Sequence, residues 1–200
     1  GERAKKEAKP EEKRGRKQIK RALEDLSKAK TIEEKAEAIQ KFKNNVFRGA
    51  NVSSEEEALI KKAEEELKKE GYEIQDLIGK EYSEGDIMEV VTYKPGDNYI
   101  KGTPDEAVKK TIFRVIEPQI NKDGKMTQRA KVIVEINTMT EAEIDAKIEK
   151  LKKTIQTKKE MKVSTKPEEE IIQELEEFKS KIKEETKPKV EEKKEEKEEL

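Results

Sequence analysis

The sequence contains no cysteine, no histidine and no tryptophan, and only 4% of its 200 residues are aromatic. Without cysteine the chain has no disulfide and no thiolate metal ligand. Without histidine it lacks the commonest general base and the commonest ligand of transition metals. Asp and Glu are so abundant that no carboxylate pair stands out as an acid–base couple. We therefore expect a protein that is not an enzyme, with no catalytic residues, no cofactor and no metal.

Long apolar runs are also absent. No stretch approaches the roughly 20 apolar residues that a membrane-spanning helix needs, and no signal-peptide core is visible. We expect a cytoplasmic protein without a membrane partner, although whether Gly1 is its natural start stays open. Because 46% of the residues are charged and 31% hydrophobic, only part of the chain is expected to be compact.

The charges balance overall but separate toward the two ends. Residues 1–21 hold ten Lys or Arg against four Glu, whereas residues 167–200 hold eight Lys against fourteen Glu. A basic start is one mark of a nucleic-acid arm, but this one has no aromatic side chain to stack on a base. We interpret residues 1–15 as a disordered basic tail and residues 187–200 as a disordered Lys/Glu tail, which argues against a nucleic-acid partner.

Three amphipathic helices are predicted within residues 16–71. Their apolar residues recur at steps of three and four: Ile19, Leu23 and Leu26, then Ile32, Ala36, Ile39, Phe42 and Val46, then Leu59, Ile60, Ala63 and Leu67. Capping boxes that begin at Thr31 and at Ser53 or Ser54 open the second and third helices. Gly49 breaks the second helix, and Gly71 stands in the position of a C-cap for the third.

Two further helices are predicted in residues 139–186, opened by Thr140 and Thr165. Their apolar residues step by four, three and four: Ile144, Ile148, Leu151 and Ile155, then Ile171, Leu175, Phe178 and Ile182. Such narrow seams are typical of a helical hairpin or a coiled coil. The helices on either side of the central region therefore allow a homodimer, and the oligomeric state stays open.

Between these helical regions, residues 72–137 have the pattern of a small antiparallel β-domain. Strands are predicted around Val90, at residues 111–116 and at residues 130–136, where apolar and polar positions alternate. Asp123 and Gly124 favour a tight hairpin turn. Residues 103–106 predict the start of one or two helical turns. The predicted fold class is α+β: amphipathic helices, a small antiparallel β-domain, a helical extension and disordered charged ends.

Short motifs within residues 67–136 resemble the GrpE family of chaperone nucleotide-exchange factors. That family has a Gly-x-x-Phe segment ahead of a His-Glu-Ala-Val element, and here Gly79-Lys80-Glu81-Tyr82 leads into Met88-Glu89-Val90-Val91. The family's last hairpin has a Gly and a basic residue, then Leu-Arg-Pro-Ala and an alternating Val strand. The corresponding residues here are Gly124-Lys125-Met126-Thr127-Gln128-Arg129-Ala130.

The sequence also departs from the family pattern. Gln128 stands where the family has arginine and Arg129 where it has proline, and a shift of one residue changes the face of a strand. The helix ahead of the sheet, long and paired in the family, is interrupted near Gly49, and the two helices after Thr140 have no counterpart.

The resemblance implies a dimeric co-chaperone in protein folding and the stress response. Its β-domain would bind the nucleotide-binding domain of a DnaK-class chaperone and promote ADP release. From the resemblance, and from positions on or beside predicted strands, we expect the contact residues to be Glu89, Arg114, Gln128 and Arg129. We expect Tyr82 and Phe113 in the core. The identity of the chaperone stays open.

Two other hypotheses remain. One is a non-enzymatic scaffold, in which the helices after Thr140 form a coiled coil and the β-domain presents a docking surface. The weaker one is a nucleic-acid-associated protein that uses the basic start. Exchange activity should depend on residues 72–137, scaffolding on the seams between Ile144 and Ile182, and nucleic-acid binding on the first 21 residues.

Overall fold

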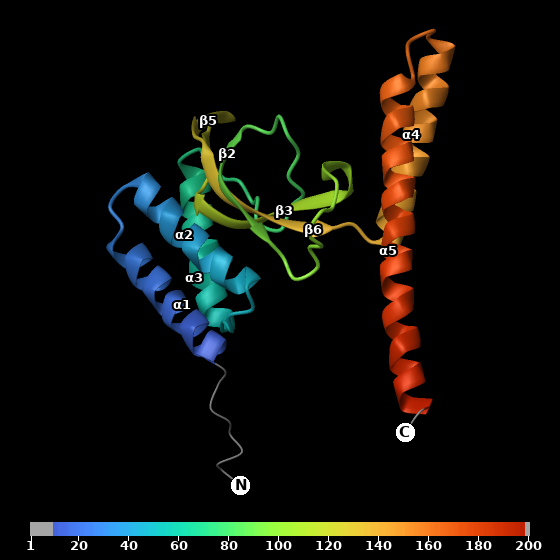
Figure 1. The fold of residues 1–200 in the computed structure, drawn as a ribbon. Helices are drawn as coiled ribbons and strands as arrows, with labels where there is room; N and C mark the ends of the chain where they lie inside the picture. Colours follow the sequence, from blue (N-terminus) through green and yellow to red (C-terminus); the bar gives the residue numbers. More distant parts are fainter. Residues whose placement is uncertain (1–9, 199–200) are drawn as a thin grey trace. The chain divides into compact units, whose positions relative to one another are not determined.

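The computed structural model describes residues 10–198, with side chains for residues 14–184, and it has the predicted α+β class (Figure 1). Helices and short strands follow one another along the chain: α1 (Pro10–Lys28), α2 (Ile32–Phe47), α3 (Ser54–Lys69), β1 (Tyr72–Ile74), β2 (Met88–Pro95), the 3-10 turn η2 (Asp105–Ala107), β3 (Val108–Glu117), β4 (Ile120–Lys122), β5 (Lys125–Gln128), β6 (Ala130–Thr138), α4 (Glu141–Glu160) and α5 (Lys166–Glu198).

The helices at the two ends include residues that the sequence analysis assigned to disordered tails. Helix α1 begins at Pro10. Proline suits the first position of a helix, because an N–H there would have no partner within the helix and the φ of proline already matches the helical value. Helix α5 continues to Glu198. The rest of the predicted tails, residues 1–9 and 199–200, lies outside the described residues.

The chain divides into two compact units, and their boundaries differ from those expected. One unit holds the chain up to Lys94 together with Lys110–Glu135, and the other holds Pro95–Lys109 together with Ile136 onward. Helices α1 to α3 and most of the predicted β-domain therefore belong to the same unit. The segment 95–109 joins the helical extension.

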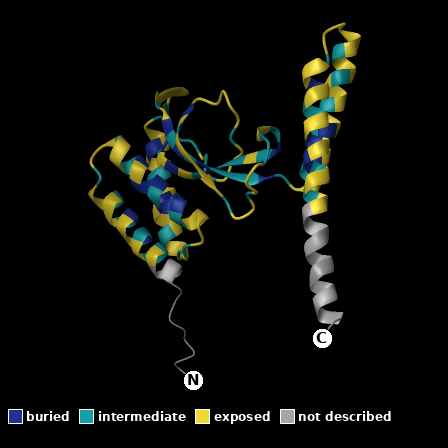
Figure 2. Ribbon diagram, in the orientation of Figure 1, coloured by how far each residue is buried: buried dark blue, intermediate teal, exposed yellow. Residues whose placement is uncertain are grey.

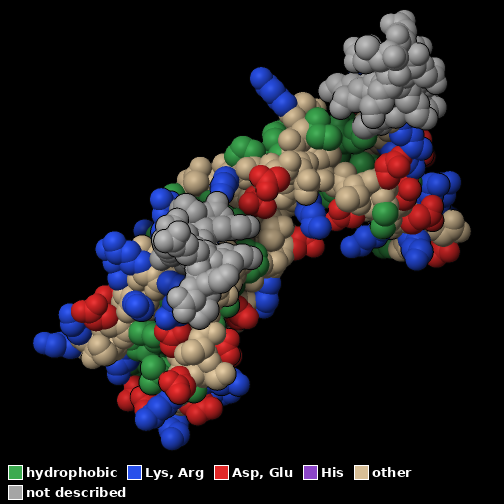
Figure 3. Space-filling model, turned by 90° about the horizontal axis from the view of Figure 1, so that it is seen from below, with side chains coloured by type: hydrophobic (Ala, Val, Ile, Leu, Met, Phe, Trp, Pro, Cys, Tyr) green, Lys and Arg blue, Asp and Glu red, His purple; other side chains and the backbone are tan. Residues whose placement is uncertain are grey.

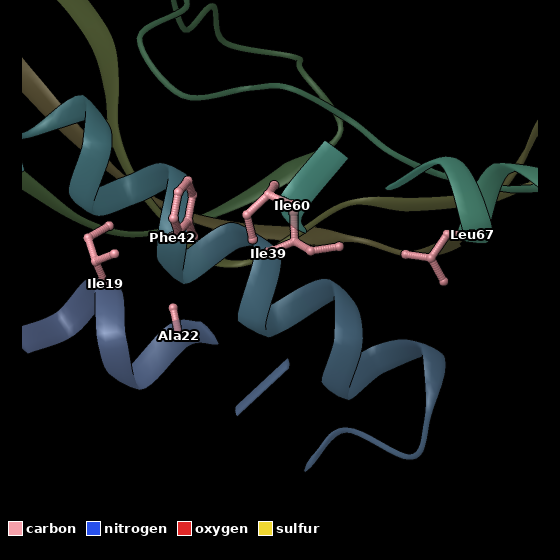
Figure 4. Packing of buried hydrophobic residues seen from close by; sticks show 6 residues of the cluster. All are labelled: Ile19, Ala22, Ile39, Phe42, Ile60 and Leu67. Carbon is pink, nitrogen blue, oxygen red and sulfur yellow. The ribbon is translucent and has the colours of Figure 1, made fainter. Parts of the chain in front are cut away.

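In the first unit, α1, α2 and α3 pack around a shared apolar core (Figures 2 and 4). Figure 4 shows the core side chains: Ile19 and Ala22 from α1, Ile39 and Phe42 from α2, and Ile60 and Leu67 from α3. Full burial of a side chain such as Ile39 or Phe42 contributes about 1.5–3 kcal/mol. The predicted apolar stripes thus pack on one another within one chain.

Helix boundaries in this unit follow local capping chemistry. Ser53 caps α3 in a complete capping box with Glu56, as predicted, and Gly71 follows its last turn at φ 89°. The box predicted for α2 forms only in part. Thr31 accepts the N–H of Glu34, but the Glu34 carboxylate accepts the N–H of Lys30, one residue earlier than a capping box requires.

Strands β1, β4 and β5 form one antiparallel sheet in the order β1-β4-β5. The β4–β5 hairpin turns at Asp123 and Gly124, whose φ angles are 48° and 82°. Two consecutive positive φ angles are the signature of a tight type I′ turn, which Asp-Gly adopts readily. The hairpin predicted at these residues is confirmed.

The second sheet has the order β2-β6-β3, so the last strand in the sequence lies in the centre. At the start of β2, the carbonyl of Met88 accepts a hydrogen bond from Arg129, which precedes β6. Past the end of β2, the N–H of Gly96 donates to Ile136 near the end of β6. Strands β2 and β6 therefore run in the same direction, and this sheet is not wholly antiparallel as expected.

In the second unit, α4 and α5 form the predicted helical hairpin around Ile144, Ile148, Leu175 and Phe178. Thr140 and Glu143 make the predicted capping box of α4. Ala107 of η2 joins the same core, and Lys147 Nζ donates to the Glu106 carboxylate at 2.9 Å. The short helix predicted from Thr103 is thus a single 3-10 turn, held against the hairpin.

Candidate partner-binding site

Helix α2 is fixed to β3 by the buried side chain of Asn44. Its amide nitrogen donates to the Val115 carbonyl (2.8 Å), and its amide oxygen accepts the Val115 N–H (3.3 Å). Gln40, one turn earlier and also buried, donates to the same oxygen at 3.0 Å. These bonds satisfy polar backbone groups that would otherwise be buried without partners, so they fix how α2 lies on the sheet.

The segment 79–82 covers another part of the β3 edge. Gly79 donates its N–H to the Ile112 carbonyl (2.8 Å), and Tyr82 donates to the Lys110 carbonyl (2.9 Å). Tyr82 is half-buried, and burial, together with the neighbouring Tyr93, raises the pKa of its phenol. The edge of β3 that faces away from β6 is therefore paired at several positions, whereas β2 ends the sheet on the other side.

Glu89 and Arg129, both predicted as contact residues, lie at the same end of the β2-β6-β3 sheet. Arg129 Nη2 donates to the carbonyl of Met88, the residue before Glu89, at 3.2 Å. Both side chains are exposed. The fold therefore brings together the two motifs on which the family resemblance rests, although they are far apart in the sequence.

Glu89 is one of three charged side chains that form a row across the sheet. Lys131 Nζ on β6 lies 4.0 Å from the Glu89 carboxylate on β2 and 3.6 Å from the Glu117 carboxylate on β3. The Glu89 side chain is 54% exposed and the pairs are long, so each contributes only a few tenths of a kcal/mol, up to about 1. Such loosely held groups can change partners at little cost.

Gln128 occupies a different environment from Arg129. Its side-chain amide donates to the Pro118 carbonyl at 2.8 Å, and the residue is half-buried at the end of β5. This bond ties the hairpin to the turn that follows β3. Of the two adjacent residues proposed as contacts, Arg129 is the more accessible.

Arg114, the fourth predicted residue, is exposed and directly follows Phe113, whose ring has two other cations beside it. Lys94 Nζ lies 4.2 Å from the centroid of the Phe113 ring, and the Arg48 guanidinium lies 5.6 Å from it. Burial, together with the positive charge of Arg114, lowers the pKa of Arg48. Phe113 itself is half-buried, so it lies at the boundary of the core that the sequence analysis assigned to it.

Other cations near this cluster have acidic partners. Lys110 pairs with Glu84 at 3.4 Å, and Lys131 pairs with two glutamates. Within the part of the chain whose side chains are described, Arg48, Lys94 and Arg114 make no ion pair. Neither Arg48 nor Lys94 could be selected from the sequence, because only the fold brings the end of α2 and β2 to Phe113.

An open groove of about 560 Å³ lies between α2 and α3, next to Arg48 along the chain. Both apolar and polar side chains line it, and the Lys43–Glu64 ion pair (3.0 Å) lies among the polar ones. Phe47, in this groove, is 46% exposed. On the face drawn in Figure 3, Lys and Arg are interspersed with Asp and Glu.

Other kinds of site find no support in residues 10–198. No helix in this range is both long and apolar enough to cross a lipid bilayer. No group of three or more His, Cys, Asp or Glu in the described residues is arranged to hold a metal ion. Comparison of the chain with protein-family models, curated proteins and solved structures gives no match.

Proposed function

We propose that this protein is a GrpE-like co-chaperone that binds the nucleotide-binding domain of a DnaK-class chaperone and promotes ADP release. The observation that carries the proposal is the contact between Arg129 and the Met88 carbonyl. It unites the Met88-Glu89-Val90-Val91 element and the Arg129-Ala130 element, the two sequence features that resemble the family. In this proposal Glu89 and Arg129 contact the chaperone, with Arg114 as a further contact.

The proposed mechanism is a shift in the population of chaperone conformations. A protein that binds the open form of the chaperone more tightly than the closed form must favour opening. By thermodynamic linkage it then weakens ADP binding by the same factor. No chemistry is required of the co-chaperone, which agrees with a sequence that has neither histidine nor cysteine.

Glu89 and Arg129 suit this role because their side chains are exposed and held by weak local contacts. Glu89 gives up only a long pair with Lys131 when it turns to a partner. Arg129 keeps most of its guanidinium donors free for a carboxylate, since a single contact to the Met88 carbonyl fixes its position. The dimer remains part of the proposal, although α1 to α3 already bury their apolar stripes within one chain.

The test is the release of a fluorescent ADP analogue from a DnaK-class chaperone, measured by stopped flow with and without this protein. The native protein should accelerate release, and the double variant Glu89→Ala/Arg129→Ala should reduce the acceleration about tenfold or more, which corresponds to about 1.4 kcal/mol. The matched control is Glu65→Ala/Lys68→Ala, which removes one exposed charge of each sign from α3. Equal acceleration by both variants would reject these contacts.

A scaffold remains the second candidate, and two features of the structure favour it. The turn between α4 and α5 exposes Met161 (68%) and Val163 (50%), and the α2–α3 groove exposes Phe47. Apolar side chains at such places are suited to protein contacts. A folded protein that leaves ADP release unchanged with the chaperones of its own source would favour the scaffold.

A further inference from the structure

We infer that Arg48, Lys94 and Arg114 form a docking site for an acidic segment of a partner protein, one that presents neighbouring carboxylates. All three residues belong to the same compact unit. They come from the end of α2, the end of β2 and the middle of β3. The site shares Arg114 with the proposed chaperone contacts but does not include Glu89 or Arg129, and the inference does not depend on the proposed exchange activity.

The ring of Phe113 organises the site. Lys94 Nζ, at 4.2 Å from the ring centroid, and the Arg48 guanidinium, at 5.6 Å, are both within the range of cation–π attraction. This attraction holds both cations beside the same ring. The positive charge of Arg114, the next residue in β3, helps to lower the pKa of Arg48, so its charge adds to the same region.

The backbone beneath the cluster is also fixed. Arg48 directly follows the last turn of α2 and donates its N–H to the Asn44 carbonyl at 3.2 Å. The side chain of Asn44 in turn binds Val115, the residue after Arg114. The same asparagine therefore fixes the backbone at Arg48 and beside Arg114. A preorganised group of this kind loses little freedom when a ligand binds.

Charge complementarity identifies the chemistry of the occupant. Like charges held close together repel, and the repulsion is relieved when an anion binds between them. Nearby lysines already have glutamate partners, whereas these three cations have none within residues 14–184. Guanidinium groups also match the planar geometry of a carboxylate through paired N–H donors.

The arrangement suits protein carboxylates better than a nucleic acid. Single-stranded nucleic acids bind along grooves in which cations follow the backbone and free aromatic rings stack on bases. Here the cations gather at one place, and the Phe113 ring is already engaged by Lys94 and Arg48. A short acidic segment needs only a compact site of this kind.

The test is fluorescence anisotropy with a fluorescein-labelled peptide that contains four consecutive glutamates, titrated with the full chain at low ionic strength. We expect binding, and we expect Arg48→Gln/Lys94→Gln/Arg114→Gln to weaken it about tenfold or more. The matched control is Arg14→Gln/Arg21→Gln/Lys68→Gln, which removes the same exposed charges, two Arg and one Lys, elsewhere in the chain. It should retain binding within about twofold.

A second variant guards against loss of structure. Arg48→Lys/Arg114→Lys keeps the charges but loses the paired N–H donors, so it should bind the peptide more weakly than the native protein and more tightly than the triple glutamine variant. Circular dichroism should confirm that each variant is folded. The inference is overturned if the native chain does not bind the peptide, or if both glutamine variants lose binding equally. A labelled oligothymidylate that binds more tightly through the same three residues would also overturn it, in favour of a nucleic-acid site.

Discussion

The side-chain amide of Asn44 forms both backbone hydrogen bonds of Val115, so that one helical residue takes the place of a neighbouring strand. Loss of the Asn44 amide should lower the free energy of unfolding substantially, because Val115, whose N–H and carbonyl it binds, is buried. This contact also determines where the end of α2, with Phe47 and Arg48, meets β3. Stability and the shape of the surface are therefore linked at Asn44.

Replacement of Asn44 tests that link. Asn44→Ala should lower the free energy of unfolding by about 2–4 kcal/mol, because it removes two hydrogen bonds and leaves Val115 and Gln40 without partners. Urea denaturation gives the measurement. The control is Asn45→Ala, whose side chain bonds only to Lys41 within the same helix. Equal losses in the two variants would contradict the special role of Asn44.

Acid should destabilise the first unit through Glu56. The Arg16 guanidinium, at 2.7 Å, and the Ser53 N–H lower the pKa of this carboxyl from its ordinary value of 4.5 to about 2. Because the folded pKa is the lower one, the charged pair stabilises the fold above pH 4.5. That contribution is lost as the pH falls from 4.5 toward 2.

The variant Glu56→Gln isolates this effect, because glutamine can still close the capping box with Ser53. It should be about 1–2 kcal/mol less stable than the native protein at pH 6, and the difference should shrink toward zero near pH 2. Urea unfolding between pH 2 and 7 measures it, with Glu65→Gln on the exposed face of α3 as control. A difference that does not change with pH would show that the lost charge is not the cause.

Gly79 should be intolerant of a side chain for two reasons. Its φ angle is +80°, and a Cβ atom there would lie 2.8 Å from Cε2 of Phe47. Gly85 has a similar φ of +99° but open space around the same position, so Gly85→Ala reports the backbone cost alone. We expect thermal unfolding to show Gly79→Ala less stable than Gly85→Ala by about 1–3 kcal/mol. The added variant Phe47→Leu should recover part of the difference.

The α4–α5 hairpin depends on Leu175, which is fully buried against Ile144 and Phe178. Leu175→Ala should cost about 2–5 kcal/mol, because it leaves a cavity in a small core. Hydrogen exchange should show reduced protection of α4 and α5, with little change in α1 to α3, whose core is separate. Val163→Ala, in the exposed turn of the hairpin, should have almost no effect. Uniform loss of protection along the chain would contradict separate cores.

Local chemistry made much of the secondary structure predictable. The caps at Ser53 and Thr140, and the Asp123-Gly124 turn, depend on residues within four positions of one another, and each formed as expected. Helix spacing likewise predicted which faces are buried. The box at Thr31 formed only in part because the carboxylate of Glu34 reaches Lys30 instead.

Strand order and the cation cluster could not be predicted from the sequence, because both depend on contacts between residues far apart along the chain. Alternating Val132 and Val134 predicted a strand, but nothing local places β6 between β2 and β3. One signal was available for the Asn44 contact. Gln40 and Asn44 are polar residues spaced by four beside the apolar face of α2, and buried polar side chains need partners from another element.

The central position of β6 has a consequence for how the chain acquires its structure during synthesis. Strands β2 and β3 leave the ribosome first, and their shared neighbour follows only with Ala130–Thr138. Until then the two strands have no hydrogen-bonded partner between them, and pairing must wait for a contact that spans many residues. Helices α1 to α3 form early from local contacts and offer a surface on which the late sheet is completed.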